Sequence, residues 1–237
     1  MARLHQFLLA LVFLTRLPLG RFLPDRVLPL SGSLWAFPLV GALIGALAGL
    51  PLLLDGPPLL LAAGAVTLAV WLTGALHEDA LADFTDAAGG RDRESRLRIM
   101  RDSHIGSYGV MALILATALR IAALTVAGPA ALIAACAGGR TAIVLAMAAL
   151  PPARSDGLGR AAGRPSGGAI GIAALIAVLI LLPQGWAGLA AALAGLAVLS
   201  LVIRQARRWL GGQTGDVLGS ASLLTETAML VVFAMLK

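Results

Sequence analysis

The strongest constraint on this chain is a series of long apolar segments with almost no charged residues. Apolar residues make up 59% of the sequence and charged residues 13%, whereas about 25% of the residues in a soluble domain are charged. A helix needs about 20 apolar residues to cross the hydrocarbon core of a bilayer. We therefore predict an all-α, polytopic transmembrane helix bundle with about six to seven spans. The candidate spans are residues 34–54, 59–76, 105–127, 129–150, 169–182, 186–203 and 217–236.

Other features of the sequence favour one membrane domain. No Ser/Pro-rich linker is present and no polar stretch is long enough to fold alone, so residues 1–237 are predicted to form a single integral membrane domain. Gly41, Gly45 and Gly49 have the spacing that lets two helices pack closely. Cys136 is the only cysteine, which excludes a disulfide framework. Residues 4–14 lack a signal-peptide cleavage site, and we interpret them as a retained helix on the membrane surface or partly inserted.

Basic residues lie in alternate connections between the candidate spans. The connections at residues 55–58, 128 and 183–185 contain no basic residue, whereas the others are rich in arginine. By the positive-inside rule, the basic connections and the N-terminus are predicted to be cytoplasmic, in an inner (plasma) membrane. No basic groove interleaved with aromatic residues is visible, so a nucleic-acid partner is not expected. The basic connections are residues 3–26, 91–101, 154–164 and 204–208.

An acidic segment follows the second candidate span. Asp79, Asp83 and Asp86 are spaced i, i+4 and i+7, which places them on one face of a helix that continues from the membrane. No Lys or Arg within the segment offsets their charges. Carboxylate oxygens suit a hard cation such as Mg²⁺, so we predict a Mg²⁺ site formed by these residues together with Glu78. A solvated acidic helix end is the alternative.

A cluster of arginines follows this acidic segment in the sequence. Those between Arg91 and Arg101 are positioned to anchor the chain at the membrane, but guanidinium groups also bind phosphate in a fork. Carboxylates that hold a metal, beside such arginines, are typical of phosphoryl transfer. Arg140 lies inside an apolar span, which indicates a functional position or a buried partner, and Arg120 is a weaker case. Two glycine-rich loops, residues 154–160 and 211–216, bring one carboxylate each to the same side of the membrane.

Several motifs together resemble the cobalamin synthase family. They are the segment from His77 to Asp83, residues 100–106, the Gly139-Arg140 pair and residues 211–219. Residues 13–18 and 37–41 resemble the beginning of that family, so the likeness covers almost the whole chain in order. The sequence departs from the family pattern at Ala80, where glycine is usual, and at His104, where arginine is usual.

The resemblance implies the last step in assembling the cobamide nucleotide loop. In that reaction a ribose hydroxyl of α-ribazole, or of its 5′-phosphate, attacks the phosphorus nearer the corrinoid in adenosylcobinamide-GDP, and GMP leaves. The resemblance assigns catalytic roles to Asp79, Asp83, Asp86 and Asp102, with Asp102 and Asp216 as candidates for a second metal position or for orienting the hydroxyl. The residues expected to bind substrate or phosphate are His77, Arg91, Arg101, Ser103, His104, Arg140, Arg160, Thr214 and Asp216.

Two other functions fit parts of the sequence. A membrane phosphotransferase of the CDP-alcohol type would use the same metal-assisted displacement, but its longer Asp-Gly-Ala-Arg signature is absent. A small-molecule transporter would place Arg120 and Arg140 on a substrate pathway, although no inverted repeat is obvious. Membrane lipid, a second copy of the chain and other cobamide-assembly enzymes are the further expected partners.

Overall fold

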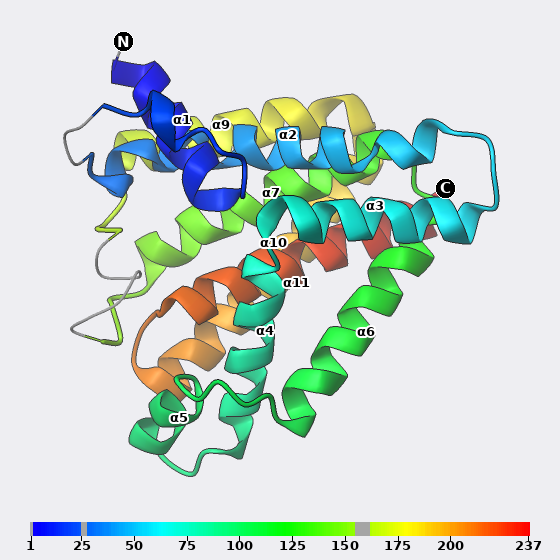
Figure 1. Ribbon diagram of the computed structural model, residues 1–237. Coiled ribbons are helices and arrows are strands. Elements are labelled where there is room, and N and C mark those ends of the chain that lie inside the picture. Colours follow the sequence, from blue (N-terminus) through cyan, green and yellow to red (C-terminus); the bar gives the residue numbers. More distant parts are fainter. Residues whose placement is uncertain (1, 25–27, 155–161) are drawn as a thin grey trace.

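The computed structural model describes residues 2–24, 28–154 and 162–237, and the regular elements in these ranges are helices (Figure 1). This confirms the predicted all-α class. Short 3-10 helices lie at Gly20–Phe22 (η1), Leu30–Ala36 (η2), Leu50–Leu53 (η3), Ala87–Gly89 (η4) and Leu182–Gln184 (η5). The α-helices are α1 (Ala2–Leu14), α2 (Phe37–Ala48), α3 (Pro58–Thr73), α4 (Leu76–Asp86), α5 (Arg93–Ile99), α6 (Ser107–Leu124), α7 (Pro129–Ala149), α9 (Gly167–Leu181), α10 (Gly185–Leu210) and α11 (Gly215–Met235).

The described residues contain five stretches that are long and apolar enough to cross a membrane, or six if α3 and α4 count as one bent span. One of these stretches, Gly167–Leu210, comprises α9 and α10, which are joined by η5. The predicted polytopic bundle is therefore confirmed. The first span ends earlier than predicted, at Ala48, because Gly49 and Pro51 follow it and do not favour a continuing α-helix.

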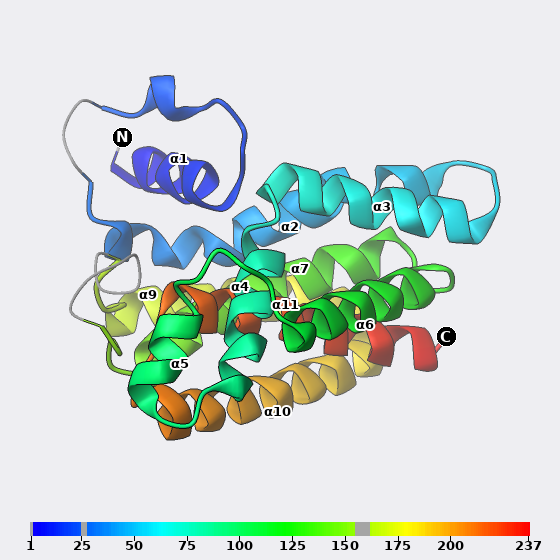
Figure 2. The same cartoon turned by 60° about the horizontal axis from the view of Figure 1, so that its bottom comes forward.

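Helices α7 and α11 form the centre of the bundle (Figure 2). Within the apolar window of each helix, 83% of the residues of α7 and 72% of those of α11 are buried, against 28% for α6. The outer face of α6 exposes Ile114, Leu115 and Leu119. Apolar side chains in such a position are stable in contact with lipid, so α6 is a peripheral helix of the bundle.

Glycines allow the central helices to approach one another. A Cβ atom on Gly45 of α2 would lie 2.7 Å from Cα of Ile133 in α7, and one on Gly139 of α7 would lie 2.8 Å from the carbonyl oxygen of Ser222 in α11. Gly41 is likewise in contact with the backbone of α7. The predicted small-residue packing is confirmed for Gly41 and Gly45, and a further close approach joins α7 to α11.

The chain turns sharply between α3 and α4. Gly74 and Ala75 both have left-handed backbone conformations, with φ of 66° and 59°, and the two helices meet at 88°. A left-handed glycine commonly ends an α-helix, and here the backbone N–H of Arg16 donates to Leu72 O at 2.8 Å beside the turn. The prediction that the acidic helix continues from the second span is therefore wrong. Instead, α4 runs across the direction of α3 (Figure 1).

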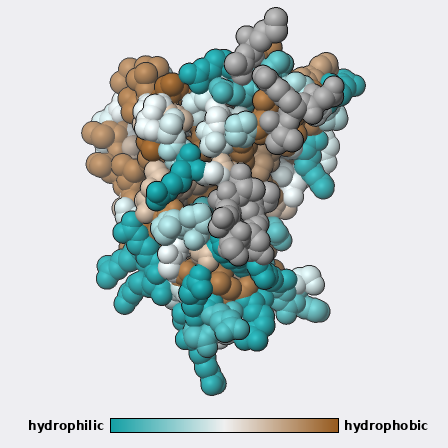
Figure 3. Space-filling view, turned by 90° about the vertical axis from the view of Figure 1, so that its left-hand side faces the viewer, coloured by the Kyte–Doolittle hydropathy of each residue, from teal (hydrophilic) through white to brown (hydrophobic). Residues whose placement is uncertain are grey.

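The described basic residues of α5 and of the C-terminal end of α10 lie at one end of the bundle. In Figure 1 this end is on the left, where α5 and the C-terminal end of α10 lie, whereas the C-terminus and the connection between α2 and α3 lie on the right. Figure 3 views the left-hand end and shows hydrophilic residues concentrated in its lower part. The C-terminal end of the acidic helix α4 leads through η4 into α5 at this end.

Candidate active site

Helix α4 packs directly against the beginning of α11. The hydroxyl of Ser220 donates to the carbonyl oxygen of Ala80 at 2.9 Å, and a Cβ atom on Gly219 would overlap the methyl group of Ala80. The alanine that departs from the family pattern is therefore accommodated because the facing residue has no side chain. This close crossing brings the acidic face of α4 to the first turn of α11.

The crossing brings carboxylates of α4 near the carboxylate of Asp216 in α11. Burial raises the pKa of Asp83 to about 7, with further contributions from the negative charges of Asp216, Asp79 and Asp86. Asp83 is half-buried and Asp79 is exposed, so the acidic face opens toward solvent. The site formed by Asp79, Asp83 and Asp216, which we call the acidic site, combines residues that are far apart in the sequence.

The glycine-rich segment before α11 pairs with the residues that follow α7, whereas most of the other glycine-rich loop, residues 155–160, lies outside the described residues. The N–H of Gln213 donates to Pro151 O and the N–H of Ala153 donates to Gln213 O, each at 2.8 Å. A Cβ atom on Gly212 would lie 3.0 Å from the nitrogen of Ala153, so the close contact requires glycine there. This backbone pairing fixes the start of α11 relative to the end of α7.

Thr214 caps α11 and orients the carboxylate of Asp216. Its hydroxyl oxygen accepts from the N–H of Val217 at 3.3 Å, as is usual for an N-cap threonine, and its hydroxyl donates to Asp216 Oδ2 at 3.2 Å. Thr214 is buried and Asp216 is partly exposed. The structure therefore gives Thr214 a positioning role, and its predicted contact with substrate stays a prediction.

Arg154 supplies positive charge to the acidic site. It follows the paired segment at Ala153, and its charge lowers the pKa of Asp83, opposing the effect of the carboxylates. Its guanidinium donates to Leu97 O at 3.1 Å. The sequence analysis chose Arg160 from the same loop, but Arg160 lies outside the described residues. Arg154 could have been identified as the first basic residue after the fourth span.

The arginines between 91 and 101 are divided between structural and exposed positions. Arg93 donates to Leu210 O at 2.8 Å and to the carbonyl oxygen of Ala153, and Arg96 stacks over the ring of Trp209. These contacts hold α5 against the paired loops. Arg91 and Arg101 are exposed, and their predicted roles in binding phosphate stay predictions.

Asp86 caps the N-terminus of α6. Its two carboxylate oxygens accept from the backbone N–H groups of Gly106 and Gly109 at 2.7 and 2.8 Å. The carboxylate is buried, and a negative charge is favourable beside a helix N-terminus. Asp86 therefore lies on α4 as the i, i+4, i+7 spacing predicted, but its carboxylate is bonded to the N-terminus of α6. Its role as a metal ligand and catalytic residue stays a prediction.

The segment before α6 is exposed. Asp102 Oδ1 accepts from the backbone N–H of His104 at 3.0 Å and contacts His104 Nδ1 at 2.6 Å, and these hydrogen bonds lower the pKa of Asp102. Ser103 lies between them and is also exposed. Asp102 and His104 therefore bond to one another. The roles predicted for Asp102, Ser103 and His104 stay predictions.

A second group of charged residues lies inside the bundle. Arg120 of α6 donates to Glu78 of α4 and to Glu226 of α11, each at 2.9 Å, and Arg140 of α7 pairs with the other carboxylate oxygen of Glu226. The side chains of Arg120, Arg140 and Glu226 are almost completely buried. We call these four residues the buried ion-pair cluster. Arg140 thus has the buried partner that the sequence left open as an alternative to phosphate binding.

Glu226 is the residue at the centre of this cluster that sequence reasoning missed. It is the only acidic residue within the last apolar segment after Asp216, and an acidic residue in a span is as informative as an arginine. Glu78 was predicted to be a metal ligand. In the structure its carboxylate accepts a hydrogen bond from Arg120. Its metal role stays a prediction.

The Mg²⁺ site predicted from the sequence stays a prediction. Within the described residues, no three His, Cys, Asp or Glu side chains come close enough to hold a metal ion by themselves. Mg²⁺, however, is commonly bound by one or two carboxylates together with phosphate oxygens. Asp79 and Asp83 on α4 and Asp216 in the first turn of α11 are the carboxylates available for such a shared ion.

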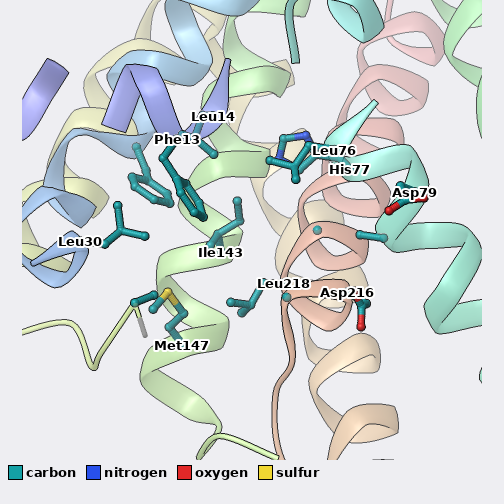
Figure 4. Close-up of a pocket in the computed structure, with 15 residues that line it drawn as sticks. Phe13, Leu14, Leu30, Leu76, His77, Asp79, Ile143, Met147, Asp216 and Leu218 are labelled. Atoms are coloured by element: carbon teal, nitrogen blue, oxygen red, sulfur yellow. The ribbon is translucent and has the colours of Figure 1, made fainter. Parts of the chain in front are cut away.

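A cavity of about 180 Å³ adjoins the acidic site (Figure 4). Phe13, Leu30 and Ile143 lie on one side of it, and Asp79 and Asp216 lie on the other. The cavity therefore has an apolar wall and an acidic edge. Most ligand sites in proteins combine these two features.

The fold and the site define a polytopic membrane protein with an acidic, arginine-flanked site at one end of a helix bundle. The chain belongs to the cobalamin-5-phosphate synthase family, whose model matches residues 6–234. This confirms the resemblance found in the sequence.

Curated relatives of similar length support the same assignment. A protein of Bradyrhizobium diazoefficiens is 41% identical over 95% of this chain and 92% of its own length. Relatives from Azorhizobium caulinodans and Xanthobacter autotrophicus are 42% and 45% identical, each over 94% of this chain and 92% of its own length. All three are named adenosylcobinamide-GDP ribazoletransferase. No solved structure matches the chain.

Proposed function

We propose that this chain is an adenosylcobinamide-GDP ribazoletransferase that completes the nucleotide loop of cobalamin at the acidic site. The observation that carries the proposal is the packing of α4 against the first turn of α11, which brings Asp79 and Asp216 to the edge of one cavity, in a member of the cobalamin-5-phosphate synthase family. The family and its named relatives give no support to a CDP-alcohol phosphotransferase or a transporter.

The reaction exchanges a phosphoanhydride bond for a phosphate ester bond. A new bond forms between a ribose oxygen of α-ribazole or its 5′-phosphate and the phosphorus nearer the corrinoid, the bond from that phosphorus to GMP breaks, and the hydroxyl proton passes to a carboxylate of the site. Both substrates are anionic, so catalysis depends on offsetting charge and aligning the reactants. Arg154 is placed to contribute positive charge, and Asp216, oriented by Thr214, is placed to align the hydroxyl.

Asp79 and Asp83 would hold Mg²⁺ in this proposal. When bound, the ion would neutralise charge on the pyrophosphate oxygens and so stabilise the transition state. Asp216 is close enough to influence Asp83 and would complete the negative environment of the ion. Asp86 contributes through its charge, while its oxygens remain bonded to the N-terminus of α6.

We also propose that the acidic site faces the cytoplasm from an inner membrane. Helix α4 leads through η4 into the arginine-rich helix α5, and the positive-inside rule favours a cytoplasmic position for such a basic segment. Single cysteines at Arg98 and Asp55, both exposed and at opposite ends, would test the orientation because Cys136 is buried. An impermeant reagent added outside intact cells should label the cysteine at 55 and not that at 98.

Purified protein should release GMP from adenosylcobinamide-GDP only when α-ribazole or its 5′-phosphate is present with Mg²⁺. Asp83→Asn removes a carboxylate of the acidic site, whereas Asp55→Asn removes one at the opposite end. Loss of GMP release in the first variant but not in the second would support the site. GMP release at the normal rate by Asp83→Asn would contradict it. Lipid contacts, self-association and complexes with other cobamide-assembly enzymes remain separate proposals.

A further inference from the structure

The cavity beside the acidic site has an aromatic and aliphatic wall. The rings of Phe13 and Phe37 are stacked, with centroids 6.0 Å apart and planes inclined by 25°. Ile143 and Met147 of α7 extend this wall, and both are buried. A flat apolar group entering the cavity would contact ring faces and aliphatic carbons, which are favourable neighbours for an aromatic ligand.

One polar side chain interrupts the apolar wall. His77 lines the cavity and is 3% exposed, and its Nε2 atom has no hydrogen-bond partner among the described residues. A buried polar atom without a partner is costly and uncommon in folded proteins. Figure 4 shows His77 between the apolar side and the edge formed by Asp79 and Asp216. A ligand with one ring nitrogen could therefore complete the hydrogen bonding of His77.

The size of the cavity limits what can enter it. An engineered apolar cavity of roughly 150 Å³ accepts benzene. The volume of about 180 Å³ is therefore suited to a small aromatic ring system and is far too small for a corrin. Guanine would fit by size, but several of its polar groups would be left without partners against Phe13, Phe37, Ile143 and Met147.

We propose that this cavity binds the aromatic base of the ribazole substrate, with its free ring nitrogen at His77. The assignment rests on the proposed function and specifies which part of which substrate the site selects. With the base inserted, the attached ribose would lie toward the acidic edge, which Asp79 and Asp216 line. The corrinoid and its nucleotide would then approach from the open side of the acidic site.

Filling the cavity tests the assignment. Met147→Phe adds bulk inside it, whereas Leu145→Phe adds the same ring two residues along α7, where the side chain lines a different cavity. For Met147→Phe, the KM for α-ribazole 5′-phosphate should rise about 10-fold or more, as expected for one misfitted group in an apolar pocket. The KM for adenosylcobinamide-GDP should stay unchanged, and Leu145→Phe should alter neither.

Enlarging the cavity gives a measurement that does not depend on the amount of folded protein. Ile143→Ala should raise the ratio of kcat/KM for an analogue with a larger base to kcat/KM for the normal substrate. His77→Ala should abolish discrimination against an analogue in which the free ring nitrogen is replaced by carbon. Both are ratios within one protein sample, so loss of folding cannot produce them.

The outcomes separate the two proposals. Suppose that wild-type protein releases GMP, that Met147→Phe leaves the KM for α-ribazole 5′-phosphate unchanged, and that the ratios for Ile143→Ala and His77→Ala match those of wild type. The base then lies elsewhere, and only this inference is overturned. If wild-type protein fails to release GMP with both substrates and Mg²⁺, the proposed function is overturned and this inference with it. An equal rise of both KM values in Met147→Phe would also overturn the base assignment.

Discussion

The acidic site and the buried ion-pair cluster use the same kinds of side chain in opposite ways. In the buried cluster, two glutamates and two arginines pair with one another inside the bundle. In the acidic site, Asp79, Asp83 and Asp216 repel one another, with Arg154 as an opposing charge. The first group is balanced by its own members, whereas the second carries excess negative charge at the edge of a cavity. The members of a balanced buried cluster depend on one another, so that loss of one is costly to the fold, whereas an unbalanced group is suited to binding a cation and substrate.

The largest effect is expected from breaking the buried cluster. Glu226→Ala would leave the charges of Arg120 and Arg140 buried without their common partner. Removal of one member of a buried ion pair commonly costs about 3–5 kcal/mol. Thermal unfolding in detergent should therefore shift strongly for Glu226→Ala and hardly at all for Glu94→Ala, because Glu94 is exposed. Equal stability of the two variants would show that the cluster is not a structural element.

Neutralising the acidic site should have the converse effect. Asp83→Asn removes a repelling charge, so the folded protein should unfold at the same temperature as wild type or higher. Its kcat should fall by about 100-fold or more, the scale seen when one electrostatic contact to a transition state is lost. GMP release and thermal unfolding, measured on one preparation, distinguish the two effects. A destabilised but fully active variant would reverse the comparison.

The junction between the two regions can be tested through Gly219. Gly219→Ala would place a methyl group against that of Ala80 and force α4 away from α11, at a cost of about 1–3 kcal/mol for overpacking. Ala80→Gly removes the opposing methyl, so the double variant should recover most of the lost stability and activity. If the two substitutions were simply additive, the close crossing would not be the cause.

The smallest effect is expected for Arg140→Lys. Lysine keeps the positive charge beside Glu226 but has fewer fixed donors, so we expect a loss of about 1 kcal/mol in stability, against a larger loss for Arg140→Ala. Binding of adenosylcobinamide-GDP should be unchanged for the folded fraction of both variants. Weaker binding by the folded Lys variant would return Arg140 to the phosphate-binding residues.

Most of the bundle could be predicted because apolar length is a local property of the sequence. Each predicted span corresponds to helix over most of its length, and Gly41 and Gly45 mark a real close contact. The turn at Gly74 and Ala75 was missed because an uninterrupted apolar pattern gives no sign of a left-handed backbone at an alanine. The acidic helix was consequently expected to continue from the membrane.

The candidate site was predicted less completely because its residues come from separate helices. The spacing of Asp79 and Asp83 identified one face of α4, and the family motif identified Asp216, but the sequence did not show that Asp86 would turn to the N-terminus of α6. Arg154 was overlooked in favour of its neighbour in the loop. A charged residue's role depends on which partner reaches it, and spacing within one helix does not contain that information.

By itself, the sequence determined the membrane-helix class, the end of the bundle where charge gathers, and the family. Long apolar runs and alternating basic connections are sufficient for this because lipid imposes length and charge rules on every segment. Only the tertiary structure decided which charges belong to the fold and which to the site. Arg140 meets a carboxylate 86 residues away, and Arg120 meets the same carboxylate across 106 residues. Such pairings follow from how closely the helices pack, which glycines distributed over several helices make possible together.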